Sequence, residues 1–395
     1  MWLRRLELSD LRSYQHVTLD LPEGVMVLVG ANGQGKTNLL EAIYRAATGS
    51  SHRAAGDAPL VRAGAQLGVI RCELSTDGGR RRTLDLEVGS GRRTRTRVDG
   101  QQVHRSSDAL GVLRAVMFAP EDVAIVRGDP SERRRFLDEL LAQRRPAFAA
   151  ARSEYDRALR QRNQLLKQAR GLSADAREAA AGTLEVWTEQ LVRHGAQIIA
   201  ARVAAIRTLA GPVDRFYREL ADRPERIALT YRWSAGDDLA PIPEDDEVAA
   251  DPVPDPAPIS EALRAAFTER RDDELARGQT LVGPHRDDLE LAIGALPARG
   301  YASQGEAWSL ALALKLATFE VLAQVGDRPI VLLDDVFAEL DRSRRSRLAA
   351  ACGRFDQTLV SAAVEEDVPL EGARVDVVID DGVTRLSPRW QAGAA

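Results

Sequence analysis

The pattern of apolar and polar residues at the start of the chain predicts three strands followed by a helix. Leucines at the start of the chain open the first strand, and Val17, Leu19 and Leu21 alternate strictly with polar residues in the second. Pro22-Glu23-Gly24 separates the second strand from five apolar residues, 25–29, which predict a third strand buried on both faces. Apolar residues then recur at helical spacing as far as Ala47.

Residues 67–105 show the alternation of an antiparallel sheet. Three strand-like stretches, 67–75, 82–89 and 94–103, are separated by turn residues that include Asp77-Gly78-Gly79 and Asp99-Gly100. Seven arginines gather in this region: Arg80, Arg81, Arg82, Arg92, Arg93, Arg95 and Arg97. Three of them alternate along one strand, so this face is either a solvated sheet surface or a surface that contacts phosphate backbones.

From Ser131, a candidate N-cap, the apolar spacing becomes helical, and Pro146 interrupts it. A heptad-like pattern between 184 and 198 spans too few repeats for an extended coiled coil. We therefore interpret 125–235 as a compact helical insertion with a short helical hairpin. The acidic, Pro-rich segment 236–260 predicts a solvated loop or linker, and a helix is expected over 261–277.

The last third of the chain returns to buried strands. An apolar helix over 307–325 precedes the strand 329–333, and 358–361 forms a further apolar run. The expected fold is an α/β P-loop ATPase head with a mixed sheet, carrying the helical insertion lobe. The expected divisions are 1–124 for the first part of the ATPase lobe, 125–275 for the helical lobe, and 276–395 for the second part of the ATPase lobe.

Composition narrows the class of protein. The 395 residues are 44% hydrophobic and 29% charged, and no window of about 18 apolar residues predicts a membrane span. The start of the chain has no signal-peptide core, and two cysteines, Cys72 and Cys352, offer neither a metal spacing nor a disulfide framework, so we expect a cytoplasmic protein. Net charge is −5, but 236–260 holds eight acidic and no basic side chains, which leaves the rest at +3.

The first candidate functional motif directly follows the strand 25–29. Gly30-Ala31-Asn32-Gly33-Gln34-Gly35-Lys36-Thr37 fits the phosphate-loop pattern G-x-x-x-x-G-K-[ST], and it lies between a strand and a helix as that motif requires. The glycines allow backbone N–H groups to form an anion nest at a helix N-terminus. Lys36 can reach the terminal phosphates, and the Thr37 hydroxyl can bind Mg²⁺, so we predict nucleotide binding.

A second motif completes the site. The strand 329–333 ends in Asp334 and Asp335, a Walker B pattern in which one carboxylate holds Mg²⁺ and the other orients or deprotonates the attacking water. The pair lies about 300 residues after the phosphate loop, a spacing much wider than in small GTPases or kinases.

Two other polar stretches have alternative interpretations. Ser303-Gln304-Gly305-Glu306 opens the apolar helix, and it is either an ordinary helix cap or an anion-binding turn that contacts a nucleotide held by another copy. His285-Arg286-Asp287-Asp288 suggests metal binding or hydrolysis, but neighbours in sequence do not make a ligand set. We therefore expect a structural turn there.

Together these motifs resemble the ATP-binding-cassette head ATPases and, among them, the RecF family. The resemblance rests on stretches spread over nearly the whole chain in the expected order: Leu11–Tyr14, Gly30–Glu41, Phe118–Asp122, Arg134–Asp138, Thr280–Asp288, Ser303–Glu306 and Leu332–Asp341. It implies that Gly30 to Thr37 bind ATP, that Thr37 and Asp334 serve Mg²⁺, and that Lys36 and Asp335 are catalytic. It also implies that Arg12 approaches the nucleotide and that Ser303, Gln304, Gly305 and Glu306 contact ATP across a head-to-head dimer.

In function, the resemblance implies an ATP-dependent DNA-binding protein of recombinational repair, DNA replication and the SOS response. Family members dimerise with ATP on gapped, single-stranded or junction DNA, hydrolyse ATP slowly in a DNA-stimulated way, and act with RecO and RecR to help load RecA. The alternatives are a structural SMC-like scaffold ATPase, which needs long coiled-coil arms, and a transporter ATPase subunit, which needs a membrane partner.

The chain departs from the family pattern at two places. Many relatives read Ser-x-Gly-Gln-Gln-Arg at the signature, whereas Glu306-Ala307-Trp308 follows the glycine here. Ser361-Ala362-Ala363 also lacks the histidine that transporter heads place near the γ-phosphate, which agrees with slow hydrolysis.

Overall fold

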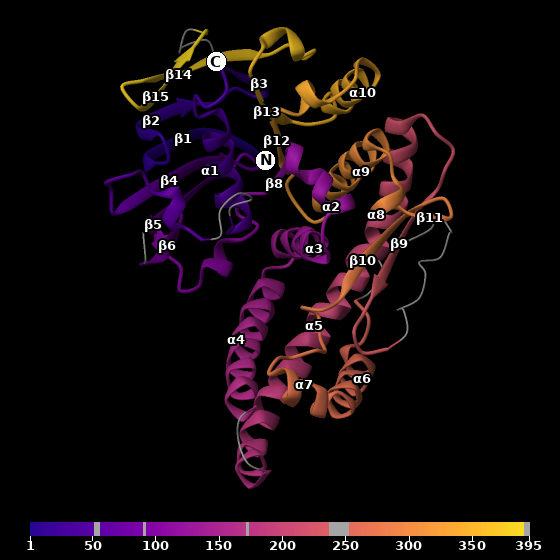
Figure 1. Ribbon diagram of the computed structural model, residues 1–395. Coiled ribbons are helices and arrows are strands. Elements are labelled where there is room, and N and C mark those ends of the chain that lie inside the picture. The colour runs from indigo at the N-terminus through magenta and orange to yellow at the C-terminus, as the bar shows by residue number, and fades with distance from the viewer. Residues whose placement is uncertain (51–55, 90–91, 171–173, 237–252, 391–395) are drawn as a thin grey trace. The chain divides into compact units, whose positions relative to one another are not determined.

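We analysed a computed structural model of the chain, which describes residues 1–50, 56–89, 92–170, 174–236 and 253–390. The chain divides into two compact units. Unit 1 comprises 1–123, 216–223 and 308–395, and unit 2 comprises 124–215 and 224–307. Figure 1 labels the elements along the chain.

Unit 1 begins with a six-stranded antiparallel sheet of order β2-β1-β4-β5-β6-β7. Its strands are β1 (Trp2–Leu11), β2 (Tyr14–Asp20), β4 (Leu67–Ser75), β5 (Arg81–Gly89), β6 (Arg92–Val98) and β7 (Gln101–Gln102). The pairing of β1 with β4 shifts between Leu3 and Arg5. This irregularity explains why Leu3 and Leu6 are both buried, although strict alternation would place them on opposite faces.

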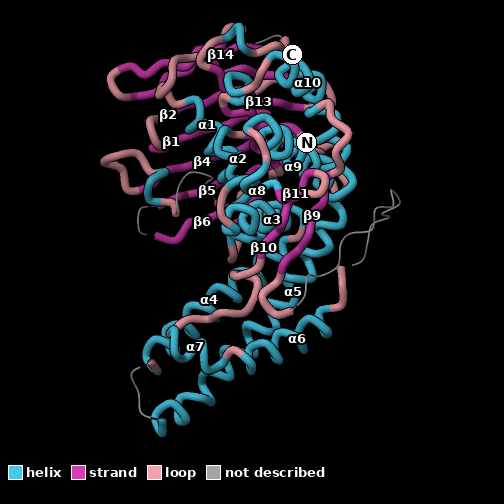
Figure 2. The backbone as a smooth tube through the Cα atoms, turned by 45° about the vertical axis from the view of Figure 1, so that its right-hand side comes forward, coloured by secondary structure: helices cyan, strands magenta, loops and turns pink. Residues whose placement is uncertain are grey.

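The second sheet of unit 1 has the order β15-β14-β3-β13-β12-β8, and both sheets are traced in magenta in Figure 2. Its strands are β3 (Gly24–Val29), β8 (Ala115–Phe118), β12 (Ile330–Asp334), β13 (Gln357–Ala362), β14 (Ala373–Asp380) and β15 (Val383–Pro388). All neighbours pair in parallel except β14 and β15. The carboxyl ends of β3, β12, β13 and β8 therefore meet at one edge, where ligands bind in open α/β sheets.

Helix α1 (Lys36–Thr48) lies between these two sheets, where it contacts β4 of the first and β8, β12 and β13 of the second. Leu39, Leu40 and Ile43 of α1 are buried in one cluster with Leu6 and Leu8 of β1, and with strand residues of the second sheet. One hydrophobic core thus anchors the helix that begins at the phosphate loop. Helix α10 (Arg342–Cys352) follows β12 in the chain, and the Asp341 side chain caps its N-terminus.

Unit 2 is mainly helical. It contains α2 (Val123–Arg127), α3 (Pro130–Arg144), α4 (Pro146–Ala169) and most of α5 (Ala174–Ala221). The helix α3 begins at Pro130 with Asp129 as its N-cap residue, so the prediction of Ser131 as the cap was wrong by two residues. The cause is Pro130, whose ring presets the helical φ at the first position.

Helices α4 and α5 form the predicted antiparallel hairpin. Arg162 of α4 contacts Thr188 of α5, whereas the earlier residue Tyr155 lies against the later residue Gly195, so the two helices run in opposite directions. The second helix is longer than the predicted short hairpin, since α5 continues through Pro212 for 48 residues.

A small antiparallel sheet completes unit 2, with the order β11-β10-β9. Its strands are β9 (Ile227–Arg232), β10 (Asp288–Ile293) and β11 (Leu296–Pro297), followed by α8 (Ala298–Tyr301). Helix α9 (Gln304–Ala323) begins in unit 2, and its residues from 308 onward belong to unit 1. The helix expected over 261–277 is instead two helices, α6 (Pro256–Glu269) and α7 (Arg271–Arg277). The loop predicted at 236–260 is overturned at its end, because α6 starts at Pro256, while 237–252 lie outside the described residues.

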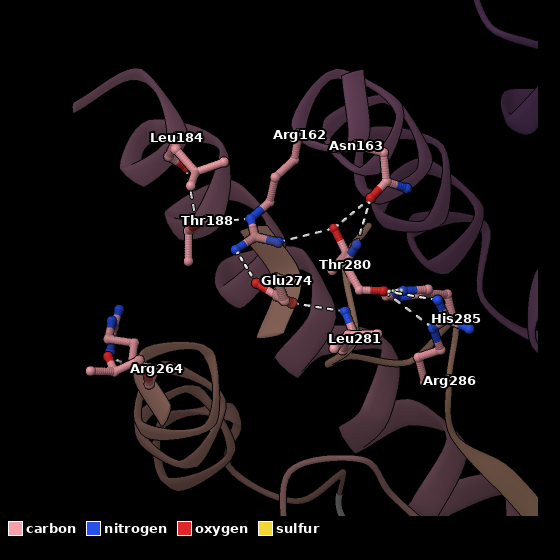
Figure 3. A network of polar contacts seen from close by, with 11 residues as sticks. Arg162, Asn163, Leu184, Thr188, Arg264, Glu274, Thr280, Leu281, His285 and Arg286 are labelled. Carbon is pink, nitrogen blue, oxygen red and sulfur yellow. Dashed lines mark hydrogen bonds and ion pairs between the residues drawn. The ribbon is translucent and has the colours of Figure 1, made fainter. Parts of the chain in front are cut away.

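A buried ion pair ties α4 to α7 (Figure 3). Arg162, which interrupts the apolar spacing of α4, is 2% exposed and donates a 2.6 Å hydrogen bond to Glu274 of α7. The same guanidinium donates to the hydroxyls of Thr188 and Thr280 at 3.0 Å each. Glu274 also accepts from the Leu281 N–H at 2.7 Å. The charges are thus paired and hydrogen-bonded, which is the condition for burying them.

The units bear on the predicted domain divisions. The first division, after residue 124, lies one residue from the end of the first segment of unit 1. The last segment of unit 2 ends at 307 and includes β10, which pairs with β9. The division into functional lobes stays a prediction. Among the helices that the structure describes, none has the length and apolar character needed to cross a membrane.

Candidate functional site

The phosphate loop follows β3 at the carboxyl edge of the parallel strands. Gly33 and Gly35 adopt left-handed backbone conformations, with φ of 82° and 99°. A Cβ at Gly30 would lie 2.2 Å from the carbonyl oxygen of Val377 in β14. Glycine at these positions is therefore required by conformation and by close approach to a neighbouring strand.

Lys36 and Thr37 occupy the first turn of α1. The Lys36 ammonium donates to the carbonyl oxygens of Gly30 and Ala31 at 2.7 and 3.1 Å, and the side chain is buried. The Thr37 hydroxyl donates to Asp334 Oδ1 at 2.9 Å. The two predicted motifs, 297 residues apart in the chain, thus meet in direct contact.

Asp334 ends β12 and is held from two sides. Besides Thr37, it accepts a 2.7 Å hydrogen bond from the hydroxyl of Ser361 in the neighbouring β13. Burial raises the pKa of Asp334 above its usual value, the two hydroxyls act against this rise, and the charges of Asp335 and Glu121 add to it. This carboxylate therefore lies among further negative charges, a setting that suits a bound cation.

Asp335 follows directly and adopts a left-handed conformation with φ of 51°. Its N–H donates to the Ser361 hydroxyl at 3.0 Å. Ser361 therefore positions both carboxylate residues of the strand end, a role that sequence analysis missed. The signal that could have found it is its place at the end of a parallel strand paired with β12.

Arg12, predicted to approach the nucleotide, makes a two-pronged ion pair with Glu41 of α1, at 3.0 and 2.9 Å. The Glu41 side chain is fully buried, and Arg12 has a positive φ of 52°. In this structure Arg12 thus orients α1 through Glu41.

The loop is also held by groups outside the phosphate-loop and Walker B motifs. Tyr14 of β2 donates to the Gly35 carbonyl oxygen at 3.0 Å, and the Thr384 hydroxyl of β15 lies 3.1 Å from that of Gln34. The Ile379 N–H of β14 donates to the Gln34 side chain. The pattern of apolar and polar residues in β14 and β15 marks none of these contacts.

The predicted signature, Ser303 to Glu306, begins α9 in unit 2 and forms a capping box. The Ser303 N–H and hydroxyl donate to the Glu306 carboxylate at 2.8 and 2.7 Å, and the Glu306 N–H donates back to Ser303 at 3.3 Å. Gln304 accepts a 2.7 Å hydrogen bond from Arg127. Ser303 and Gln304 remain exposed, so the helix cap and a contact with another copy are compatible.

Ion pairing occupies much of the arginine-rich face of the first sheet. Arg82 contacts Asp99 at 2.7 Å and Arg97 contacts Glu87 at 2.7 Å. Arg95 is exposed, whereas the side chains of Arg92 and Arg93 lie outside the description. Neighbouring carboxylates therefore neutralise part of the predicted phosphate-contacting surface.

The segment from His285 to Asp288 has structural contacts. Asp287 accepts from Tyr231 and Ser234, Asp288 pairs with Arg133, and His285 lies 2.7 Å from the Tyr155 hydroxyl. Burial lowers the pKa of His285 to about 4. Among the described residues, no group of three potential metal ligands gathers anywhere.

The mixed sheet, the phosphate loop at its carboxyl edge and the carboxylates that end β12 define a P-loop ATPase of the ABC-type head class. The family model of the RecF/RecN/SMC N-terminal domain matches residues 2–380. The DNA replication and repair protein RecF of Kineococcus radiotolerans is 48% identical over 388 residues, which cover 96% of this chain and 97% of that protein. The chain belongs to the RecF family, and so to the proteins of DNA replication and repair.

Solved structures agree with this assignment. Two structures of the recombination mediator protein RecF in the RecFOR pathway, RecF-ATPrS and RecF-ATP, match with TM-scores of 0.84 and 0.83 at 28% identity. The matches cover 98% of this chain and 98% and 97% of those chains. An SMC head bound to the C-terminal winged-helix domain of ScpA shares the fold, with a TM-score of 0.54 at 16% identity over 98% of this chain and 97% of that one.

Proposed function

We propose that this protein is an ATP-gated DNA clamp of recombinational repair. ATP and Mg²⁺ drive two copies together head to head on DNA, and slow, DNA-stimulated hydrolysis reopens the dimer. The observation that carries the proposal is the 2.9 Å contact between Thr37 and Asp334, which assembles a nucleotide site from both ends of the chain. Membership of the RecF family, with a match to RecF-ATP, supports ATP as the nucleotide.

Within one copy, residues Gly30 to Thr37 hold the triphosphate. The Lys36 ammonium already makes hydrogen bonds to two loop carbonyls, and it exchanges these acceptors for phosphate oxygens when ATP binds. Asp335 orients or deprotonates the attacking water, with its backbone held by Ser361. Arg12 approaches the nucleotide only by loosening its ion pair with Glu41.

The donor chemistry at Thr37 and Asp334 fits Mg²⁺. A hydroxyl and a carboxylate lie in contact, and both are oxygen donors of the kind this ion prefers. The raised pKa of Asp334 and the nearby carboxylates indicate an excess of negative charge that a cation relieves. When bound, Mg²⁺ stabilises negative charge on phosphate oxygens.

The second copy contributes its signature. Ser303 and Gly305 lie at the N-terminus of the 20-residue helix α9, where backbone N–H groups and the helix dipole favour an anion. In the capping box, the hydroxyl of Ser303 donates to Glu306, and it redirects this hydrogen bond toward the γ-phosphate of the partner's ATP. Contacts made by both copies stabilise only the closed dimer, so ATP shifts the population toward it.

The closed dimer binds gapped, single-stranded or junction DNA and acts with RecO and RecR to help load RecA. Support comes from the RecFOR pathway to which the matched structures belong, and from the net charge of +3 outside the acidic segment. Contacts with phosphate backbones release counterions, so the binding must weaken as salt rises.

Molar mass measured by light scattering during gel filtration tests the clamp. Wild-type protein should double its mass with ATP and Mg²⁺, whereas Lys36→Met should stay monomeric. Lys167→Met, which removes an exposed lysine of unit 2, is the matched control and should dimerise normally. A wild-type protein that stays monomeric at saturating ATP and Mg²⁺ contradicts the clamp.

DNA binding provides the second measurement. Affinity should be measured for duplex, single-stranded and gapped DNA, with and without ATP, across a salt series. It should increase with ATP and decrease as salt rises. Binding that depends on neither ATP nor salt contradicts the mechanism.

The alternative of a structural scaffold needs long coiled-coil arms. Helix α4, the shorter helix of the hairpin, has 24 residues and spans about 36 Å.

A further inference from the structure

We propose that Tyr14 and Thr384 are positioning residues that aim two backbone N–H groups of the phosphate loop at the bound nucleotide phosphates. This inference rests on the proposed binding of ATP to the loop. It assigns a role to the terminal hairpin of β14 and β15, which none of the predicted motifs includes.

The two residues hold successive carbonyl groups of the loop. The Tyr14 hydroxyl donates to the Gly35 carbonyl oxygen at 3.0 Å, and the Thr384 hydroxyl lies 3.1 Å from the carbonyl oxygen of Gln34. Tyr14 is fully buried and Thr384 is 2% exposed. Burial also raises the pKa of Tyr14, so its hydroxyl keeps the proton that it donates.

Peptide geometry converts these contacts into a direction for the N–H groups. In a planar trans peptide the C=O and the following N–H point to opposite sides. Holding the Gln34 carbonyl therefore aims the Gly35 N–H away from β15, and holding the Gly35 carbonyl aims the Lys36 N–H away from Tyr14. Successive N–H groups that face one side form the nest that binds an anion.

Proton counting connects Thr384 to the start of α1. The hydroxyls of Thr384 and Ser13 lie 2.7 Å apart, and Ser13 accepts a 3.0 Å hydrogen bond from the side-chain amide of Asn38. The Gln34 carbonyl only accepts, so Thr384 must donate its single proton there. Ser13 then donates to Thr384, and every group in the series from Asn38 to Gln34 is satisfied.

The packing leaves this arrangement little freedom. A Cβ at Gly35 would lie 2.6 Å from the Thr384 hydroxyl oxygen and 2.8 Å from that of Ser13. The Thr384 N–H also donates to the Ser13 carbonyl at 2.9 Å. The backbone of Thr384 is therefore fixed to Ser13, so its hydroxyl cannot readily follow the loop if the loop moves.

Equilibrium binding of ATP and ADP to the full chain tests the proposal. Thr384→Val removes the hydroxyl but keeps the shape, and it should weaken both affinities about three- to tenfold, the usual worth of one neutral hydrogen bond. Thr384→Ser should restore wild-type affinity. Ser387→Ala, which removes an exposed hydroxyl of the same strand, is the control and should change nothing.

Tyr14→Phe provides a second variant that removes a single oxygen atom, and it should weaken both affinities by a similar factor. The proposal is overturned if Thr384→Val and Tyr14→Phe bind ATP and ADP as tightly as wild type. It is also overturned if Thr384→Ser loses as much affinity as Thr384→Val. Either result leaves the clamp intact, whereas failure of the wild-type protein to bind ATP refutes the proposed function itself.

Discussion

The Thr37 hydroxyl donates a 2.9 Å hydrogen bond to Asp334, across 297 residues of sequence. The contact exists because β13 pairs in parallel with both β3 and β12, which brings the phosphate loop and the end of β12 to one edge. Ser361, the register partner of Asp334 on β13, donates to the same carboxylate oxygen. Sheet order thus creates the site, and the following variants test what each group does.

Asp334→Asn should separate catalysis from stability. Loss of the carboxylate should lower ATP turnover about 100-fold or more, since cation binding is removed. The pKa of Asp334 is raised in the folded protein, so its ionisation lowers the free energy of unfolding when the pH exceeds that pKa. An asparagine at this position stays neutral and does not carry this cost. The melting temperature without nucleotide should therefore rise at neutral pH. A fall in that temperature contradicts the argument.

Asp335 has a strained backbone in addition to its proposed role in hydrolysis. Asparagine tolerates the left-handed conformation, so Asp335→Asn should keep the stability and the ATP-dependent dimer but lose turnover about 100-fold. Asp335→Val should also destabilise the protein by about 1–2 kcal/mol, because a β-branched residue is poorly suited to positive φ. Turnover, gel filtration and thermal unfolding of both variants distinguish the two effects. Equal stability of the two variants counts against the strain.

Arg12 and Glu41 form a pair that a double variant can dissect. Arg12→Ala removes the guanidinium from the buried Glu41 and should destabilise the protein by about 2–4 kcal/mol. Adding Glu41→Gln should recover much of that loss, since an amide needs no counter-charge. If Arg12 also contacts ATP, the double variant should still bind ATP more weakly than Glu41→Gln alone. Equal affinities for these two proteins exclude the nucleotide contact.

His285 should make stability depend on pH. Its pKa is lowered by burial to about 4, whereas an unfolded histidine titrates near 6.5. The unfolded chain binds the extra proton first, so stability is complete above about pH 6.5 and falls as the pH drops toward 4, by on the order of 3 kcal/mol. His285→Gln removes this dependence.

Denaturant unfolding of wild type and His285→Gln over pH 4 to 7 measures the effect. The raised pKa of Asp287 acts in the opposite direction, adding stability at low pH that is lost as the pH rises through its folded value. Both proteins share this second contribution. The difference between their curves therefore isolates His285, and parallel curves contradict the assignment.

The buried pair of Arg162 and Glu274 should be costly to break on one side only. Arg162→Met leaves the fully buried Glu274 without its cation and should cost about 3–5 kcal/mol. The double variant with Glu274→Gln should recover part of this, because the amide oxygen still accepts from the Leu281 N–H. Denaturant unfolding measures both. Equal loss in the single and double variants shows that packing, not charge, is responsible.

Local patterns in the sequence predicted the elements that carry the site. The apolar run before Gly30, the glycines of the loop and the two carboxylates after 333 each have a physical requirement that is visible within a few residues. The same holds for the antiparallel strands 67–75 and 82–89, which the structure confirms as β4 and β5. The mixed sheet and its helices likewise match the expected fold class.

Contacts between distant segments could not be predicted in this way. Ser361 and Thr384 are hydroxyl residues of two strands, and their partners become neighbours only through sheet order. Arg162 appeared to interrupt a helical stripe, yet it is buried because Glu274, more than 100 residues later, supplies its counter-charge. Such pairings depend on topology, which periodicity does not encode.

The order of strands around β3 has a consequence for synthesis of the protein. The strand that leads into the phosphate loop ends at residue 29, yet its two neighbours, β13 and β14, begin at residues 357 and 373. A nascent chain on the ribosome therefore carries an unpaired β3 until β13 and β14 have been translated, more than 300 residues later. Nucleotide affinity should accordingly be acquired late, only after β13 and β14 have been synthesised and have paired with β3.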